Sequence, residues 1–572
     1  MILKMVSKII PAIIALIAPL CHSKTYNFET EGGIPNDSDC DIYTNLNATC
    51  NHNTNVFNTI ILNLQSNDVF YLPNKTFWFN GGIGNAYVPE RRYTGLQDIT
   101  FLIDGTFSLQ DNRDWYTPEP DRDHVANFFG FWNLDNVTFT SNGKGTIQGN
   151  GAKWWGYIRY LINEGDRPKL LDIGDSKNLL VEHIVFLDPP EWTTWFNGVE
   201  NLEIRYSAID VRRNDRDEHG LWNLGSLNTD GFDVKGKNIY IHDVDIWNDD
   251  DCICVKDSHG ADKIPCSQDM VFENIRASGL GLALGSIRAR EDHTCIRNIT
   301  FRNAYMHNTV KGIYLKTRSG YDGPGDYASG IVEDVLFENV TMFEPKQWPI
   351  WIGPNQAAYA DACALEWPYC PVGVLCRCPV PAEISVKNIT LKDIKIIRPD
   401  GSPGLVMANS TNPFERITFD NVIVEEPGLE PWGEDFYKCE NTEGYVRRGT
   451  WPVPKCFVNA LDCGGGEFCA YGDKCVRNSD GNGLCEICGE GSYCGDGDTE
   501  TACPDGYTSG EGAKTVDECF EVEVTSQEIT TDKVSTVESS TAEDTTSEIL
   551  TTSASLKNLP VFILFYVRFL LI

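Results

Sequence analysis

Basic side chains are scarce in this chain. Its 572 residues include 47 Lys and Arg against 82 Asp and Glu, which gives a formal net charge of −35. A surface of that sign repels phosphates, so we expect no nucleic acid among the partners. A polyanionic sugar would be repelled for the same reason unless basic side chains gather in one place. An acidic substrate therefore requires a local group of cations.

Long apolar runs are also missing beyond the N-terminus. The final apolar stretch, residues 559–572, contains Arg568 and is shorter than the roughly 20 apolar residues that a membrane-spanning helix needs. Small residues at 553–555 fit the attachment site of a lipid anchor, although the spacer at 556–558 is shorter than usual. We therefore expect residues 556–572 to be a hydrophobic tail, and membrane attachment through a C-terminal lipid anchor is one hypothesis for its role.

Helical periodicity is absent between residues 170 and 425, and Asn-Gly or Asp-Gly turns between alternating strands are scarce. These absences disfavour a helical fold and an antiparallel sandwich or propeller. What recurs is an Asn followed by alternating aliphatic residues and then turn residues. Copies begin at Asn136, Asn201, Asn238, Asn298 and Asn388, with a last one at Arg416. Short strands in irregular coils predict an all-β chain, a parallel β-helix solenoid whose stacked coils share one core.

The N-terminus has the features of a secretory signal. Lys4 and Lys8 precede an apolar run that ends at residue 20, and small or polar residues follow, so we predict a signal peptide at residues 1–23. Its removal leaves 20 of the 21 cysteines, an even number that suits disulfides in an oxidising compartment. Seven Asn-x-Ser/Thr sequons agree with a secreted, extracellular glycoprotein: Asn47, Asn74, Asn136, Asn298, Asn339, Asn388 and Asn409.

The composition changes along the chain. Residues 24–462 hold the strand pattern and form the predicted β-helix domain, whereas residues 463–520 contain eight cysteines among many glycines. Eight cysteines predict a small disulfide-rich module whose connectivity the sequence leaves open. A zinc half-site at Cys485 and Cys488 is the alternative, but export favours disulfides. Residues 521–555 are rich in Ser, Thr and Glu and predict a disordered stalk.

Two acidic clusters lie within the strand pattern. The first contains Asp230 in an Asn-Thr-Asp-Gly sequence, and the second is the Asp-Asp-Asp-Cys sequence at 249–252. Between them, residues 238–246 alternate as a half-buried strand does. If one coil is about that long, the two clusters return side by side. Converging carboxyls suit glycosidic cleavage, with one protonated to assist the leaving oxygen and another ionised to activate water. A solvated turn or a calcium loop is the alternative for three consecutive aspartates.

These clusters, in this order, resemble the signature of glycoside hydrolase family 28, the polygalacturonases. The resemblance extends over about residues 100–425 through further segments at 145–155, 189–192, 279–286 and 312–317. It implies a right-handed parallel β-helix that hydrolyses pectin, an acidic polysaccharide, with inversion and without a metal or cofactor. It also implies Asp250 as general acid and Asp230 and Asp251 as bases, with roughly 6.5–9.5 Å between acid and base carboxyls.

One departure concerns Asp249, where the family usually has Gln. On a regular strand Asp249 and Asp251 would share a face and Asp250 would point away. For Asp250 and Asp251 both to reach the cleft, the backbone has to bend between them, as at a bulge or strand end.

Two departures concern the substrate. Where polygalacturonases carry His between glycines, this chain has Leu280, which cannot hydrogen-bond a carboxylate. Where they carry Arg two residues before Lys, it has Tyr314, which stacks or packs but cannot form the bidentate pair that Arg makes with a uronate. The predicted substrate-binding residues are Asn228, Lys316 and Tyr314, together with Arg288, which like Arg290 and Arg318 flanks the family segments and could supply a local cation. The departures favour rhamnogalacturonan or xylogalacturonan over plain homogalacturonan.

The sequence thus predicts a secreted, monomeric glycoside hydrolase of pectic polysaccharide that the cysteine-rich module and stalk hold near a cell surface or wall. A non-catalytic carbohydrate-binding or adhesive solenoid is the alternative from another class. A polysaccharide lyase on the same solenoid is a third hypothesis, which would need calcium and a basic residue as proton abstractor. The paired acids argue against the lyase.

Overall fold

The computed structural model describes the chain from residue 23 to residue 521 with gaps. The described ranges are 23–35, 46–80, 93–110, 127–143, 145–155, 167–212, 226–318, 328–355, 380–433, 436–447, 449–459 and, with short gaps, 461–521. The predictions for the signal peptide, the stalk and the C-terminal tail fall outside these residues, apart from the ends at 23 and 521. Within the described ranges, no helix is long and apolar enough to cross a membrane.

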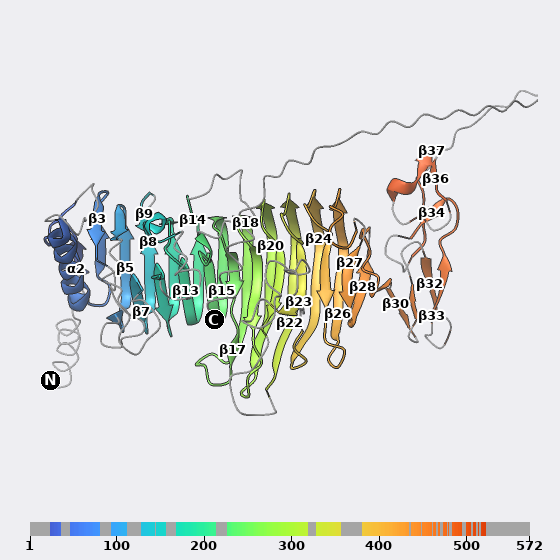
Figure 1. The fold of residues 1–572 in the computed structure, drawn as a ribbon, viewed down its shortest axis with the longest axis horizontal. Helices are drawn as coiled ribbons and strands as arrows, with labels where there is room; N and C mark the ends of the chain where they lie inside the picture. The colour runs from blue at the N-terminus through green and yellow to red at the C-terminus, as the bar shows by residue number, and fades with distance from the viewer. Residues whose placement is uncertain are drawn as a thin grey trace, which may run out of the picture.

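Successive coils stack their strands in parallel along the length of the molecule (Figure 1). One stack carries the acidic clusters: β4 (Tyr93–Thr94), β7 (Phe129–Trp132), β10 (Leu171–Gly174), the starts of β13 (Thr194–Arg205) and β15 (Phe232–Trp247), β16 (Asp251–Val255), β19 (Gly281–Ile287), β21 (Ile313–Thr317), β23 (Ile350–Asn355), β25 (Gly404–Met407) and β27 (Tyr437–Glu440). The parallel pairing of these strands confirms the predicted parallel β-helix.

Two further stacks complete each coil. The second holds β1 (Thr25–Asn27), β2 (Val69–Leu72), β5 (Gln97–Ile103), β8 (Asp135–Thr140), β11 (Lys177–Glu182), later parts of β13 and β15, β18 (Ser267–Ser278), β20 (Thr294–His307), β22 (Gly330–Phe343), β24 (Ile384–Ile397), β26 (Phe414–Glu425), β28 (Thr442–Arg447) and β29 (Val458–Asn459). The third holds β3 (Thr76–Phe79), β6 (Thr106–Leu109), β9 (Gly145–Gln148), β12 (Ile184–Leu187), β14 (Ala208–Asp210) and the ends of the long strands from β15 to β26. A short β17 (Ser258–His259) pairs antiparallel with β20.

The core lies inside the coils and is built from equivalent positions of successive strands. Phe272, Phe301 and Phe337 face one another in register on β18, β20 and β22. Their ring centroids are 4.6 Å and 4.9 Å apart, and all three rings are buried. A single coil cannot bury such a face alone, so each coil depends on its neighbours for stability.

The recurring Asn marks a corner in several of the coils, and Asp98, Asp269, Asp334 and Arg416 occupy this corner in others. The predicted corners have φ between 53° and 58°, in the left-handed region: Asn136, Asn201, Asn238, Asn298 and Asn388. Asn tolerates this region better than other residues with a side chain, because its short amide can hydrogen-bond locally. The amides also bond from coil to coil, since Asn238 Nδ2 donates to Asn201 Oδ1 at 3.1 Å. The sequence repeat is therefore a ladder of corner asparagines.

A helix that the sequence did not predict covers the N-terminal end of the solenoid. This helix, α2 (Leu46–Asn63), lies against the first coils (Figure 1). Its Phe57, Ile60 and Ile61 are buried in the same core as the strands. The ring of Phe57 meets that of Phe70 edge-on at 5.2 Å. The helix thus closes the end of the apolar column.

Short antiparallel strand pairs follow the solenoid. They are β30 (Leu461–Gly464) with β31 (Glu467–Cys469), β32 (Asp473–Arg477) with β33 (Gly483–Ile487), β34 (Ser492–Tyr493) with β35 (Thr501–Ala502), and β36 (Tyr507–Thr508) with β37 (Phe520–Glu521). Single turns of 3-10 helix occur at η3 (Gly151–Lys153) and η5 (Val516–Glu518). The change from parallel coils to small hairpins falls where the composition changes.

Disulfides occur in both regions, in keeping with an extracellular protein. The solenoid holds Cys266–Cys295 and Cys439–Cys456, and the C-terminal region holds Cys488–Cys494 and Cys503–Cys519. Since Cys488 is bonded to Cys494, a zinc half-site at Cys485 and Cys488 is not supported. The even cysteine count nevertheless misled in one respect: Cys252 and Cys254 are free thiols, both buried on β16.

Candidate active site

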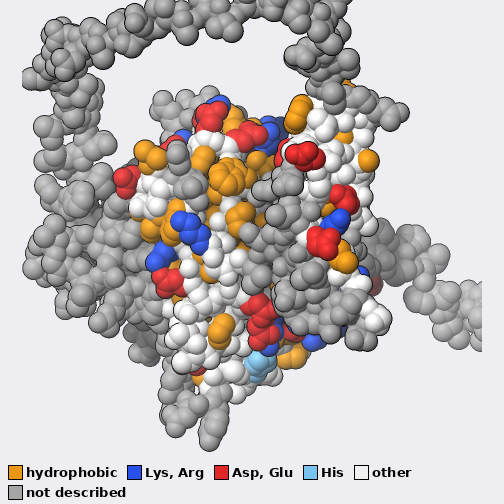
Figure 2. Space-filling view, turned by 90° about the vertical axis from the view of Figure 1, so that its right-hand side faces the viewer, with side chains coloured by type: hydrophobic (Ala, Val, Ile, Leu, Met, Phe, Trp, Pro, Cys, Tyr) orange, Lys and Arg blue, Asp and Glu red, His pale blue; other side chains and the backbone are white. Residues whose placement is uncertain are grey.

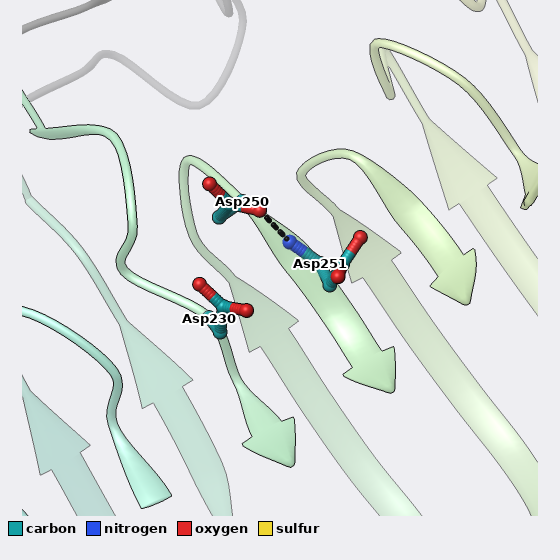
Figure 3. A group of neighbouring side chains, drawn as sticks. All are labelled: Asp230, Asp250 and Asp251. Atoms are coloured by element: carbon teal, nitrogen blue, oxygen red, sulfur yellow. Dashed lines mark hydrogen bonds between the residues drawn. The ribbon is translucent and has the colours of Figure 1, made fainter. Parts of the chain in front are cut away.

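Three carboxyls meet where the chain crosses between β15 and β16. Asp230 lies just before β15, Asp250 lies in the bend after it, and Asp251 is the first residue of β16. One oxygen from each lies within 4.8 Å of the others (Figure 3). The two strands are neighbours in the stack, and the amide of Gly231 donates to the carbonyl of Asp251 at 2.8 Å. The acids thus become neighbours because one coil separates them, as the sequence predicted.

The bend that brings Asp250 and Asp251 to the same side is held by Asn248. Its Nδ2 donates to the carbonyl oxygens of Thr229, Asp250 and Asp251 at 2.8–3.0 Å. Asp249 turns elsewhere, because Ser226 Oγ donates a hydrogen bond to its carboxylate. The chain therefore leaves the regular strand, and Asp249 is outside the group of three.

Asp250 is held by two main-chain donors and is 8% exposed. The amide of Asn228 donates to its Oδ2 at 3.0 Å, and the amide of Asp251 donates to its Oδ1 at 2.9 Å. Burial raises the pKa of Asp250 well above its usual value, and the charges of Asp230 and Asp251 add to this effect while Lys316 opposes it. A raised pKa favours the protonated form of this carboxyl.

Asp230 has a different electrostatic environment. Burial raises its pKa to about 6, and Lys256, whose Nζ lies 3.4 Å from Oδ2, is the largest opposing influence. The same ammonium lies 3.0 Å from Oδ2 of the buried Asp233. Sequence reasoning missed Lys256 and Asp233. The available signals were the charge of Lys256, directly after the mostly apolar β16, and the charge of Asp233 inside β15.

Asp251 is fully buried and is paired with Lys316, which is 3% exposed. Lys316 Nζ donates to Asp251 Oδ2 across the intervening strand β19. Strand β19 pairs with both β16 and β21, so the lysine side chain reaches across it to the carboxylate. Burial opposes the charge of Lys316, but Asp251 outweighs it and raises the pKa of Lys316 above its usual value.

The two departures from the family that concern the substrate, Leu280 and Tyr314, both pack in the interior of the protein. Leu280 belongs to the apolar core and is 6% exposed, and its amide donates to the carbonyl of Asp250 at 2.7 Å. Tyr314 is 2% exposed, and its ring lies edge-on to Trp351 at 6.0 Å. Of the two alternatives for Tyr314, stacking on a sugar or packing, this burial favours packing.

The predicted substrate-binding residues lie in different places. Asn228 and Lys316 touch the acids Asp250 and Asp251, as described above. Arg288 instead follows the last residue of β19, where its amide donates to Asp257 Oδ2 at 3.1 Å. A strand of seven residues spans about 20 Å, so Arg288 lies at the opposite end of β19 from the acids.

The cations that an acidic substrate requires are gathered in the site. Lys256, Lys311 and Lys316 all lie around the acids, and the last two are almost fully buried. By contrast, on the described surface of the C-terminal end, Lys and Arg are interspersed with Asp and Glu and form no continuous basic patch (Figure 2).

A partly exposed aromatic ring borders the acids on the preceding coil. Trp192 lies next to Thr193, whose amide donates to the carbonyl of Asp230 at 2.7 Å. Two lysine ammoniums face this ring, Lys169 Nζ at 4.5 Å and Lys256 Nζ at 4.8 Å from its centroid. A flat ring of this kind, held by cations beside a group of acids, suits the apolar face of a sugar.

Several known proteins are similar to this chain in sequence or structure. A probable rhamnogalacturonase E of Aspergillus flavus is 28% identical over 370 residues, which cover 64% of this chain and 69% of that protein. An exopolygalacturonase of Cochliobolus carbonum is 25% identical over 371 residues, covering 61% and 74%. The solved polygalacturonase of Erwinia carotovora superimposes with a TM-score of 0.49 at 16% identity, covering 74% of this chain and 96% of that one.

The sequence profile of glycosyl hydrolases family 28 matches residues 85–446. That range is more than half of the chain and includes Asp230, Asp250 and Asp251. A profile match of this extent, on a parallel β-helix with three convergent carboxyls, establishes that the chain belongs to glycosyl hydrolases family 28.

Proposed function

We propose that this glycoside hydrolase cleaves the backbone of a branched pectic polysaccharide, with Asp250 as general acid and Asp230 and Asp251 as bases. The family and its named relatives make the chain a pectin-degrading hydrolase. The observation that supports the assignment of roles is the unequal environment of the three acids. Asp250 lies between two like charges, whereas a lysine ammonium compensates each of the other two.

In this mechanism, Asp250 gives its proton to the glycosidic oxygen as the bond to the anomeric carbon breaks. A water held by Asp230 and Asp251 loses a proton to a carboxylate and attacks the anomeric carbon from the opposite face. The nearest oxygens of the three acids lie within 4.8 Å, less than the roughly 6.5–9.5 Å expected between the carboxyl groups of an inverting pair. The expectation of inversion therefore comes from the family and not from this spacing.

We choose a branched pectin because Leu280 and Tyr314 stand where polygalacturonases carry His and Arg. The side chain of Leu280 offers no hydrogen bond, and Lys316, the charged residue of the segment at 312–317, is already bound to Asp251. A site with fewer free cations suits a backbone in which acidic and neutral sugars alternate, such as rhamnogalacturonan. Trp192 would supply the platform for the neutral sugar.

The rest of the chain defines where this reaction takes place. We infer that residues 1–23 direct export and that the hydrolase domain ends near residue 462. The disulfide module and the stalk at 521–555 would then hold a monomeric enzyme near a cell surface or wall, with a lipid anchor replacing the tail at 556–572. Release of the enzyme by a phospholipase that cleaves such anchors would test the last of these proposals.

The release of reducing ends from a panel of pectins tests the proposed function, with the neighbouring aspartates as matched variants. Asp250→Asn should lose activity by about 10²–10⁴-fold, the usual contribution of a positioned general acid. Asp249→Asn should keep activity within a few-fold, because its carboxylate is bound to Ser226 and lies outside the group.

Other outcomes would identify the alternatives. Equal release of reducing ends by the wild type and by Asp250→Asn would refute the assignment of Asp250 as general acid. Binding of pectin without any release of reducing ends would indicate the adhesive solenoid. Unsaturated products that absorb in the ultraviolet, together with loss of activity on chelation, would indicate a lyase.

A further inference from the structure

Lys311 is a buried lysine beside the acids to which the proposed mechanism gives no role. It is 1% exposed and lies in the turn before β21. Its amide donates to the carbonyl of Leu280 at 2.9 Å, and Leu280 in turn is bonded to Asp250 through its own amide. Two backbone hydrogen bonds, through Leu280, therefore link Lys311 to the general acid Asp250.

The side chain of Lys311 is held between two aromatic rings. Its Nζ lies 4.6 Å from the centroid of Tyr314 and 4.8 Å from that of Trp351, which are in register on the neighbouring strands β21 and β23. Cation–π contacts position an ammonium, but the rings carry no net charge to balance it. Among the described residues, no carboxylate lies within ion-pair distance of Lys311.

A buried ammonium without a counter-charge has a high free-energy cost. The charged and titratable groups that face Lys311 are Lys316 and Tyr314 of β21 and the acids Asp250 and Asp251. Burial and the like charge of Lys316 lower the pKa of Lys311 to about 7, with Asp251 and Asp250 opposing. An anion supplied from outside the protein would remove this cost, since it would balance the charge directly.

We propose that Lys311 is the residue that binds a uronate carboxylate of the substrate beside the catalytic acids. The proposal rests on the proposed function, because it presumes that a pectic chain enters this site. Tyr314 and Trp351 act as positioning residues, since their rings fix the ammonium without competing for it. Lys311 is therefore a specificity residue that distinguishes acidic from neutral sugars and takes no part in bond cleavage.

Binding of a galacturonate trisaccharide, measured by calorimetry in the Asp250→Asn background to prevent hydrolysis, tests this proposal. The comparison ligand is the same trisaccharide with its carboxylates reduced to alcohols. Lys311→Met should weaken binding of the acidic sugar about tenfold or more, as expected for a charge-assisted hydrogen bond, and should leave binding of the reduced sugar unchanged. Lys311→Arg should restore most of the affinity.

Lys346 provides the matched control, because it lies on the next coil and pairs with Asp400 at 3.8 Å. Lys346→Met should bind both sugars as tightly as the parent, which is the Asp250→Asn protein without a further substitution. If Lys311→Met binds the acidic sugar as tightly as the parent, or weakens both sugars equally, the proposal is overturned. Failure of the parent to bind either sugar overturns it as well.

Proton uptake supplies a measurement that does not depend on removing Lys311. At pH 8 the free lysine is mostly neutral, so binding of a carboxylate should draw a proton from the solvent, and binding enthalpies in different buffers would reveal it. Lys311→Arg should show no such uptake, because Arg stays charged. Equal uptake in both proteins would contradict the assignment. Hydrolysis by the wild type on the pectin panel separately decides the proposed function.

Discussion

The ammonium of Lys316 binds the carboxylate of Asp251 across an intervening strand, although 65 residues separate them along the chain. The strand between them, β19, pairs with the strands that carry both residues. This ion pair compensates one of three convergent acids and so reduces the buried negative charge of the site.

Removal of the Lys316 ammonium should destabilise the fold. Lys316→Met leaves the fully buried Asp251 without its counter-charge, which typically costs about 3–5 kcal/mol. Chemical denaturation of Lys316→Met, of Asp251→Asn and of the double variant would measure the coupling. The double variant should recover part of the stability that Lys316→Met loses. Additive losses would show that the pair does not interact as described.

The pH dependence of activity should report on Lys256. As a base, Asp230 acts only when ionised, so kcat/KM should rise with pH through the pKa of about 6 that burial gives this group. Lys256 lowers the pKa of Asp230, so Lys256→Met should move this acid limb to higher pH.

Lys235 is the matched control for that pH profile. It lies on the same strand as Asp233 but pairs with Asp262 at 2.6 Å. The acid limb of Lys235→Met should coincide with that of the wild type. A limb that stays in place in Lys256→Met would remove Asp230 from the role of base.

Stability should fall as the pH rises through the pKa of Asp230. The folded state holds this proton more tightly than the unfolded chain does, since the pKa is about 6 against an ordinary value of 3.8. The contribution of Asp230 is therefore full below about pH 4 and is lost as the pH rises through about 6, a change of about 3 kcal/mol.

Asp230→Asn should remove that part of the pH dependence. Urea unfolding at pH 4 and pH 7.5 would measure it: the drop in unfolding free energy between the two pH values should be smaller in the variant than in the wild type. The same drop in both proteins would mean that Asp230 does not titrate in this range.

A second corner of the coils, which carries Asn274, Asn303 and Asn339, makes a prediction about stability alone. Asn303 has φ of 55°, accepts a hydrogen bond from Asn339 at 2.8 Å and donates one to Asn274 at 3.4 Å. Asn303→Ala should lower the free energy of unfolding by about 1–2 kcal/mol, because it loses these bonds and strains the corner. Asn303→Gly relieves the strain and should cost less. Thermal melts of the two variants check the order, and a less stable glycine variant would contradict it.

The repeat of Asn and aliphatic residues was sufficient to predict the solenoid, since the left-handed corner and the alternating strand both leave local signals. The helix α2 was missed for a physical reason. Its sequence holds many Asn, a weak helix former, and its stability comes from Phe57, Ile60 and Ile61 packing on the first coils. Such packing is not visible from local propensity.

The functional site was likewise predicted only in part. The meeting of Asp230 with Asp250 and Asp251 follows from the length of one coil, so the sequence was sufficient to predict it. The contacts of Lys256 and Lys311 depend on register across several coils and on which rings lie above them. Arg288 was assigned to the site because it is close in sequence, but the extended β19 carries it to the far end.

A stack of coils has no inherent limit, because the outermost coil offers unpaired backbone groups and apolar side chains to any similar coil that meets it. On the side that α2 covers, a second molecule would find a helix whose amides are already satisfied. One asparagine-rich helix therefore protects this repeat protein from growing into fibres from its first coil.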